Sequence, residues 1–318
     1  MSPNQPASGG ARTLTVPGPN GTRAYVYVWL PEGRARAAVQ IIHGMAEHAG
    51  RYARLARHLN AAGYAVYAQD LPGHGRSVRG PEELGHVADT GGWSLMLASI
   101  NMVRRHLDEE LQQMPVFALG HSMGSFLLQH LVRDPGAALA GAIFSATSGD
   151  LGALRAVGHK LLQMEALWSG RRHRSALGER LSFRDFNRRF RPNRTGFDWL
   201  SRDHAEVDRY LRDPRCGFRV SCGLWLDLLE ACAGLDAVQG VPVDLPVLLI
   251  AGSRDPVTRG KQGPESLARH YRRAGLKDVE TRIYPDARHE LFNDTCREQV
   301  TADLIQWLDD HVFQMNRG

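Results

Sequence analysis

Short apolar runs alternate along this chain with segments that have the periodicity of helices. Most of the runs consist of consecutive Val, Ile, Leu and Ala, as expected for buried strands that helices cover on both faces. They span residues 24–30, 37–43, 64–70, 116–120, 141–146, 247–252 and 280–284, and a weaker run spans residues 12–16. The run at residues 24–30 alternates instead, with Tyr25, Tyr27 and Trp29 on one side, and therefore predicts an antiparallel edge strand.

The segments between these runs carry the spacing of helices. In one of them, apolar residues recur every three or four positions, at Met96, Ile100, Val103, Leu107 and Leu111. Residues 52–63 end at a glycine, which is a common C-terminal stop, and residues 300–315 predict a further helix. Strands that alternate with helices predict an α/β fold with a mostly parallel, doubly wound sheet of about eight strands.

One long segment interrupts this alternation. Residues 148–235 contain no strand pattern, but they have helical patterns at residues 151–168 and 223–235. Because the segment is too long for a loop in a compact domain, we expect a structured insertion. The predicted organisation is therefore a core and a helical cap, preceded by a disordered tail rich in Pro, Gly and Ser. The core comprises residues 13–147 and 236–318, the cap residues 148–235 and the tail residues 1–12.

The sequence GHSMG at residues 120–124 joins a predicted strand directly to a predicted helix. It has the form G-x-S-x-G, the nucleophile elbow. Small residues at positions 120 and 124 let strand and helix approach closely, while Ser122 takes a strained conformation that exposes its hydroxyl. The helix that follows directs its N-terminal amides toward that hydroxyl, where negative charge would develop. The pattern therefore predicts Ser122 as a nucleophile.

A serine nucleophile needs a general base and a group that orients the base. In parallel sheets, catalytic groups gather in the loops beyond the carboxyl ends of the strands. Asp255 follows the run that ends at residue 252, and His289 follows the run that ends at residue 284. Asp150, which follows the run ending at residue 146, is a rival for the acid. The order Ser122, Asp255, His289 is the expected order for a triad on this kind of sheet.

The last requirement is a pair of amides that bind an oxyanion. The run at residues 37–43 leads into a turn at Gly44, so the amide of Met45 can face the same point as the amide of Met123. Gly44, Glu47 and Arg51 belong to this turn and the segment after it, which makes them candidate substrate-binding residues. Glu47 and Arg51 could bind a polar head group, or they could form an ion pair that stiffens the loop.

Five motifs together resemble one branch of the α/β-hydrolases, that of monoacylglycerol lipases and bacterial lysophospholipases. They are HGMAEHAGRY, QDLPGHGRS, GHSMGS, AGSRDPV and YPDARHE, within a match over residues 24–313. The resemblance implies Ser122 as nucleophile, His289 as base, Asp255 as its orienting acid, and the amides of Met45 and Met123 as the oxyanion hole. It also implies a mobile helical cap over an acyl-binding tunnel. Leu162 and Trp168 belong to an apolar stripe that could line such a tunnel, although a stripe of this kind more often only packs a helix.

The predicted activity is that of a serine carboxylic-ester hydrolase that forms an acyl-enzyme from monoacylglycerol-like or lysophospholipid-like esters. An aminopeptidase or an acyltransferase with the same triad stays open, and so does a non-catalytic ligand-binding relative. The serine at the elbow excludes epoxide hydrolases and haloalkane dehalogenases of this fold, which have aspartate there. We expect no cofactor and no metal, because HELFN at residues 289–293 is not H-E-x-x-H and the four cysteines lack ligand spacing.

The charge of the chain is modestly positive. The formal net charge of +5 is small for 318 residues and does not indicate nucleic acid as a partner. Nine arginines are concentrated within residues 171–194, against Glu179 and Asp185 and with three phenylalanines among them. This basic cap segment indicates either a surface that contacts anionic lipid or a solvated face above packed phenylalanines.

The sequence also bears on location. A hydrophobic fraction of 43% and a charged fraction of 23% are those of an ordinary globular protein. The first residues have no apolar segment typical of a signal peptide, and no apolar run is long enough to span a bilayer. We therefore expect a cytoplasmic protein whose membrane contact, if any, is peripheral. The sequence leaves the oligomeric state open.

Overall fold

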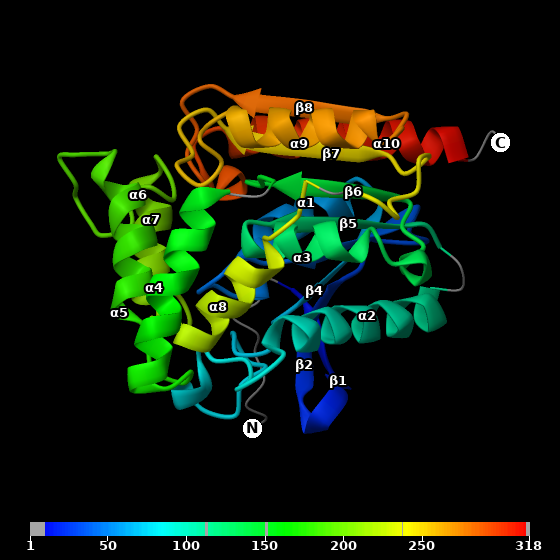
Figure 1. Ribbon diagram of the computed structural model, residues 1–318. Coiled ribbons are helices and arrows are strands. Elements are labelled where there is room, and N and C mark those ends of the chain that lie inside the picture. The colour runs from blue at the N-terminus through cyan, green and yellow to red at the C-terminus, as the bar shows by residue number, and fades with distance from the viewer. Residues whose placement is uncertain (1–9, 112–113, 150–151, 237, 316–318) are drawn as a thin grey trace.

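An eight-stranded sheet lies at the centre of the computed structural model (Figure 1), which describes residues 10–111, 114–149, 152–236 and 238–315. The strand order is β1-β2-β4-β3-β5-β6-β7-β8. Strands β3 to β8 are mutually parallel, whereas β2 runs antiparallel to both of its neighbours. The strands are β1 (Arg12–Pro17), β2 (Arg23–Trp29), β3 (Ala37–Ile42), β4 (Tyr64–Gln69), β5 (Val116–His121), β6 (Gly141–Ser145), β7 (Val247–Gly252) and β8 (Val279–Tyr284). The predicted mostly parallel sheet is confirmed.

Strand β2 is antiparallel, as its alternating pattern predicted, but it does not lie at the edge of the sheet. The rings of Tyr25 and Tyr27 lie 5.1 Å apart and those of Tyr27 and Trp29 lie 5.7 Å apart, so the three aromatics do share one face. The weak run at residues 12–16 forms β1, which pairs with β2 along its whole length and takes the edge position. The prediction of an edge strand at residues 24–30 is therefore wrong, because β1 covers that edge.

Helices cover both faces of the sheet. Helices α1 (Ala53–Ala61) and α10 (Arg297–Met315) pack on one face, and α2 (Gly92–Leu111), α3 (Met123–Leu131) and α9 (Gln262–Arg273) pack on the other. Successive strand residues point to opposite faces, so the buried side chains of each parallel strand divide between two apolar clusters. This arrangement explains why the strands are continuous apolar runs.

The cap lies between β6 and β7 and contains the helices α4 (Ala153–Ser169), α5 (Ala176–Glu179), α6 (Asp185–Arg188), α7 (His204–Arg212) and α8 (Cys222–Ala231). Figure 1 shows α4 to α7 in green beside the carboxyl ends of the parallel strands, with α4 packed along α8. None of the helices in the described ranges is both long enough and apolar enough to cross a membrane. The predicted tail falls mostly on residues 1–9, which lie outside the described residues. Its boundary at residue 12 is wrong, because Ala11 is buried and Arg12 begins β1.

Candidate active site

Ser122 lies in a strained turn between β5 and α3. Its backbone has φ 51° and ψ −120°, which a residue with a side chain rarely adopts, and its amide donates to the carbonyl of Ser145 at 2.9 Å. A Cβ atom on Gly120 would overlap the carbonyl of Gly124, and a Cβ atom on Gly124 would overlap the carbonyl of Ile42. The turn therefore exists only because both flanking positions are glycine.

His289 and Asp255 form a buried pair. Both oxygens of the Asp255 carboxylate lie 3.0 Å from Nδ1 of His289. Because a carboxylate only accepts, Nδ1 carries the proton, and Nε2 is left as an acceptor. Burial lowers the pKa of His289, but the Asp255 carboxylate outweighs burial and leaves this pKa above the usual 6.5. The rival acid, Asp150, lies outside the described residues.

The loop that carries His289 lies beside the serine turn. The ring of His121, which directly precedes Ser122, has its centroid 4.9 Å from that of His289. Among the described residues, the ring nitrogens of His289 hydrogen-bond only to Asp255, and the contact between a base and its nucleophile often tightens only in the substrate complex. The structure thus brings Ser122, His289 and Asp255 to one edge of the sheet.

Two other histidines near the serine have local roles. Burial, followed by the nearby His289, lowers the pKa of His121 to about 4, so its ring is neutral at neutral pH. Nδ1 of His43 donates to the carbonyl of Gly44 at 2.7 Å, and Nε2 accepts from the amide of Leu71 at 2.9 Å. Both rings are therefore held by local contacts, and His289 is the better candidate for the base.

The turn after β3 touches the serine. A Cβ atom on Gly44 would lie 3.2 Å from Cβ of Ser122. The amide of Met45 donates to no acceptor in the part of the chain that the structure describes. Met123 is the first residue of α3, and the first amides of a helix have no acceptor within it. The amides of Met45 and Met123 therefore lie on two segments that meet at Ser122, and neither has a backbone acceptor among the described residues.

Glu47 and Arg51 form an ionic network with Glu290. One oxygen of Glu47 accepts from the amide of Gly44 at 2.7 Å and from the hydroxyl of Tyr52 at 3.0 Å. The other oxygen accepts from Arg51 at 2.8 Å, and Arg51 also donates twice to Glu290, at 2.6 Å each. Burial opposes ionisation of Glu47, but Arg51 more than compensates and lowers its pKa. These contacts favour the loop-stiffening alternative over the head-group alternative for both residues.

The two predicted tunnel residues occupy opposite environments. Leu162 is buried in the apolar cluster that α4 shares with α8. Trp168 is 89% exposed near the end of α4. The prediction that Trp168 lines a tunnel is therefore wrong, because its side chain lies in solvent and not against other residues of the cap.

Three residues that the sequence did not identify contact the site. The ring of Trp199, from the cap, lies 4.8 Å from that of His289, and the amide of Glu290 donates to the carbonyl of Leu200 at 2.8 Å. The hydroxyl of Tyr210, on α7, donates to the carbonyl of Ala46 at 2.9 Å. No local sequence motif predicts the contacts of Trp199 and Tyr210, because each contact joins the cap to a loop of the core.

One group of possible metal ligands occurs among the described residues, formed by His48, Asp213 and Cys216 with donor atoms within 4.8 Å of one another. Burial raises the pKa of the Cys216 thiol well above its usual range, which disfavours the thiolate that a metal requires. Asp213 already accepts from His48 at 2.9 Å and from Arg215 at 3.3 Å. The group is better explained as a hydrogen-bonded cluster than as a cation site.

The central parallel sheet, the strained serine turn and the buried histidine–aspartate pair define an α/β-hydrolase. More particularly, the chain belongs to the serine aminopeptidase S33 family, whose model matches residues 33–296. It is 28% identical over 311 residues to the monoacylglycerol lipase of Mycolicibacterium smegmatis, covering 93% of this chain and 96% of that protein. It is also 28% identical over 306 residues to the monoglyceride lipase of Homo sapiens, covering 93% and 88% of the two chains.

Solved structures give the same result. A carboxyl esterase from Bacillus coagulans has a TM-score of 0.86 and 26% identity to this chain, covering 95% of this chain and 99% of that one. The predicted branch of the α/β-hydrolases is confirmed by these likenesses, and so is the enzyme class, that of carboxylester hydrolases.

Proposed function

We propose that this protein hydrolyses lipid esters of the monoacylglycerol or lysophospholipid type through Ser122, His289 and Asp255. The observation that carries the proposal is the buried His289, whose Nδ1 is held by both carboxylate oxygens of Asp255 beside the strained Ser122 turn. This arrangement leaves Nε2 free to accept the serine proton. The amides of Met45 and Met123 are the proposed oxyanion hole.

The proposed reaction has two halves. Ser122 attacks the ester carbonyl while Nε2 of His289 takes its proton, and the two amides stabilise the negative charge on the carbonyl oxygen. The protonated His289 then gives its proton to the departing alcohol, which leaves an acyl group on Ser122. Water repeats the sequence and releases the fatty acid. Asp255 keeps the imidazole in the required tautomer and stabilises its protonated form.

The outer surface of the cap supports a lipid substrate. Side chains at i, i+4, i+7 and i+11 on α4 form an exposed apolar stripe, which consists of Val157, Leu161, Met164 and Trp168, and Leu167 lies beside it. Exposed arginines of the basic cap segment, among them Arg172, Arg184 and Arg188, follow α4 in the chain. An apolar stripe with basic neighbours is suited to an anionic membrane surface. We therefore propose peripheral membrane contact through the cap.

The direct test is fatty-acid release from a medium-chain monoacylglycerol and from a lysophosphatidylcholine by wild type, Ser122→Ala and Ser94→Ala. Ser94 is an exposed residue of α2 and provides a matched control. We expect release by wild type and Ser94→Ala and none by Ser122→Ala. Equal release by Ser122→Ala and wild type would refute the nucleophile. No release by any of them would refute the substrate class.

An aminopeptidase is the second candidate, because the family is described as serine aminopeptidases. Such an enzyme needs a free carboxylate near the serine to bind the substrate amine. The nearby carboxylates of Glu47 and Glu290 both pair with Arg51, so neither is a free partner for an amine, which favours an ester substrate. Turnover of amino-acid p-nitroanilides faster than of monoacylglycerol would reverse this preference.

A further inference from the structure

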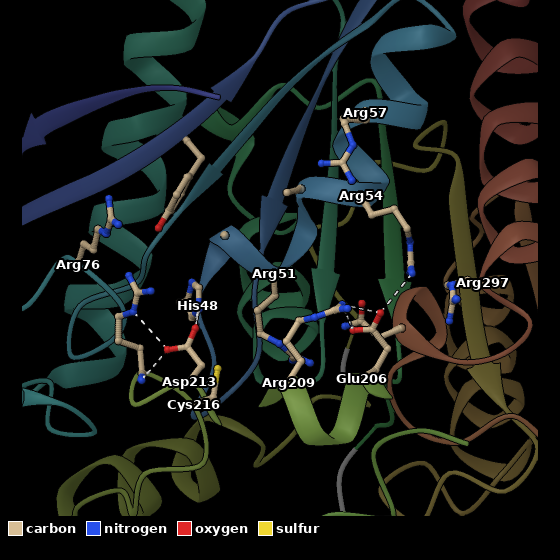
Figure 2. Close-up of a pocket in the computed structure, with 15 residues that line it drawn as sticks. His48, Arg51, Arg54, Arg57, Arg76, Glu206, Arg209, Asp213, Cys216 and Arg297 are labelled. Atoms are coloured by element: carbon tan, nitrogen blue, oxygen red, sulfur yellow. Dashed lines mark hydrogen bonds and ion pairs between the residues drawn. The ribbon is translucent and has the colours of Figure 1, made fainter. Parts of the chain in front are cut away.

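A cavity lies apart from the proposed catalytic residues. It has a volume of about 530 Å³ and lies where α1, the cap helix α7 and the start of α10 meet (Figure 2). The residues that line it include none of the proposed catalytic residues Ser122, Asp255 and His289. Its charged wall consists of the acids Glu206 and Asp213 and the arginines Arg51, Arg54, Arg57, Arg76, Arg209, Arg215 and Arg297.

The carboxylates around this cavity do not neutralise all of its arginines. Glu206 accepts from Arg209 at 2.7 and 2.8 Å and is approached by Arg54 only at 3.5 Å. Arg57 has no carboxylate partner among the described residues, and Arg76 donates to the hydroxyl of a tyrosine instead. The guanidinium of Arg54 thus has only a distant carboxylate partner. Those of Arg57 and Arg76 have no carboxylate within ion-pair distance among the described residues.

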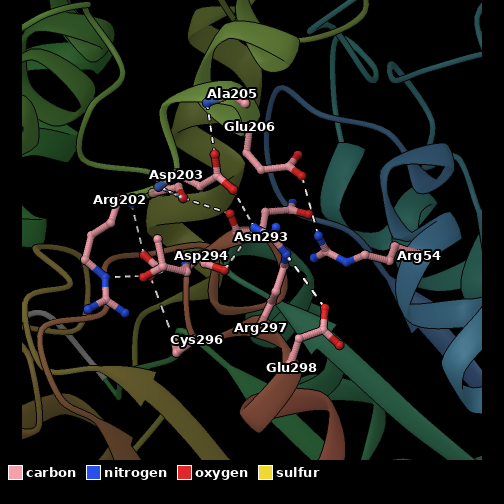
Figure 3. A network of polar contacts seen from close by, with 12 residues as sticks. Arg54, Arg202, Asp203, Ala205, Glu206, Asn293, Asp294, Cys296, Arg297 and Glu298 are labelled. Carbon is pink, nitrogen blue, oxygen red and sulfur yellow. Dashed lines mark hydrogen bonds and ion pairs between the residues drawn. The ribbon is translucent and has the colours of Figure 1, made fainter.

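A further arginine lies on the side shown in Figure 3, where it is paired with a carboxylate. Arg297, the first residue of α10, pairs with Asp203 at 2.5 Å and lies near Arg54. Burial, followed by Arg297, lowers the pKa of Arg54, and Arg209 contributes in the same direction. These cations are held close together by packing between the core and the cap, so a bound anion would relieve their mutual repulsion.

We propose that this cavity binds a phosphate-bearing anion. Guanidinium groups bind phosphate oxygens through two parallel hydrogen bonds, and a phosphate can accept from several such groups at once. Arg54 and Arg57 lie one turn apart on α1, so both side chains can reach one ligand from the same helix. The ligand is either a soluble phosphorylated compound or the head group of a phospholipid, which share this chemistry. The cavity is lined by none of the three proposed catalytic residues.

Inorganic pyrophosphate is the first probe, with calorimetric titration of the full chain as the readout. The test variant is Arg54→Gln/Arg57→Gln, and the control is Arg272→Gln/Arg273→Gln, which removes the same charge from an exposed part of α9 outside both the cavity and the cap. We expect saturable binding to wild type and control, and affinity at least about tenfold weaker in the test variant. Thermal melts verify that both variants are folded. Added sodium chloride is expected to weaken binding.

Vesicles of phosphatidylglycerol and phosphatidylcholine distinguish the two sources of phosphate. Pyrophosphate binding that depends on Arg54 and Arg57 supports a soluble ligand. Co-sedimentation with vesicles that depends on the same two arginines, without pyrophosphate binding, supports a lipid head group. The proposal is overturned when neither probe binds, or when the test variant and the control bind equally well. Because every readout is binding, failure here is separable from failure of the proposed ester hydrolysis.

Discussion

The guanidinium of Arg51 and the carboxylate of Glu290 are joined by two hydrogen bonds of 2.6 Å each. Arg51 follows the turn that carries Met45, one of the two proposed oxyanion amides, and Glu290 directly follows the proposed base. Arg51 also donates to Glu47, which accepts from the amide of Gly44. One buried guanidinium therefore connects the loops on both sides of the reacting carbonyl. We interpret Arg51 as a positioning residue.

Replacing Arg51 with glutamine should lower kcat more than it raises KM. The change leaves the buried Glu47 and Glu290 without a cation, which destabilises such networks by about 3–5 kcal/mol and releases both loops. We expect kcat to fall by about one to two orders of magnitude, since misplacement by about 1 Å can reduce the rate a hundredfold. Steady-state kinetics on a soluble ester, with a thermal melt of each variant, measures both effects.

The matched control for this change is Arg36→Gln, which breaks the exposed ion pair with Asp309. It should alter stability by less than about 1 kcal/mol and leave kcat unchanged. Arg51→Lys keeps the charge but not the two parallel hydrogen bonds, so partial recovery of kcat is expected. A folded Arg51→Gln protein with the kcat of wild type would contradict the positioning role.

Asp255→Asn tests the acid. An amide in place of the carboxylate holds the imidazole in the wrong tautomer, and kcat should fall by about four orders of magnitude, as for the corresponding change in a serine protease. The measurement is the hydrolysis of a p-nitrophenyl ester, with Asp244→Asn, a change at an exposed carboxylate, as control. If Asp255→Asn had an activity close to that of wild type, Asp150 would become the candidate for the acid that orients His289.

The pH dependence of kcat/KM should report His289. The base must be neutral to accept the serine proton, so activity is lost as pH falls through its pKa. Burial lowers this pKa, but the Asp255 carboxylate raises it by more than burial lowers it. The acid limb of the profile should therefore lie above pH 6.5. In Asp255→Asn the remaining activity should have its acid limb at lower pH, because burial then dominates. An acid limb at the same pH in both proteins would argue against this pairing.

The proposed catalytic residues were accessible from the sequence because each depends on a local pattern. An apolar run followed by a turn identifies the carboxyl end of a strand, and Ser122, Asp255 and His289 each follow such an end. The glycines around Ser122 add a steric requirement that is also local. These features needed no knowledge of the tertiary contacts.

Contacts between segments far apart in the sequence could not be predicted in this way. The pairing of Arg51 with Glu290 joins residues 239 positions apart, and no spacing rule relates them. The apolar pattern around Trp168 does not reveal whether another helix packs on this residue or whether it faces solvent. The 89% exposure of Trp168 could therefore not be predicted. The edge strand was misplaced for a related reason, because the weak pattern of β1 hid the pairing that makes β2 internal.

Gly124→Ala should destabilise the fold strongly. The added Cβ would overlap the carbonyl of Ile42, a backbone atom of the buried strand β3 that cannot move aside. The free energy of unfolding should fall by about 1–3 kcal/mol or more, as measured by urea denaturation. Gly196→Ala is the matched control, since its Cβ would have no neighbour within 4 Å. Equal stability of the two variants would mean that the turn tolerates a side chain.

Leu167→Ser/Trp168→Ser should reduce membrane contact without changing the chemistry. These residues are 80% and 89% exposed on α4, and burial of such side chains in a bilayer contributes about 1.5–3 kcal/mol each. Co-sedimentation with phosphatidylglycerol vesicles should therefore weaken at least about tenfold, while hydrolysis of a soluble short-chain ester is unchanged. The control is Leu30→Ser/Val243→Ser, which removes exposed apolar residues of the core. Equal sedimentation of both variants and wild type would locate any membrane contact elsewhere.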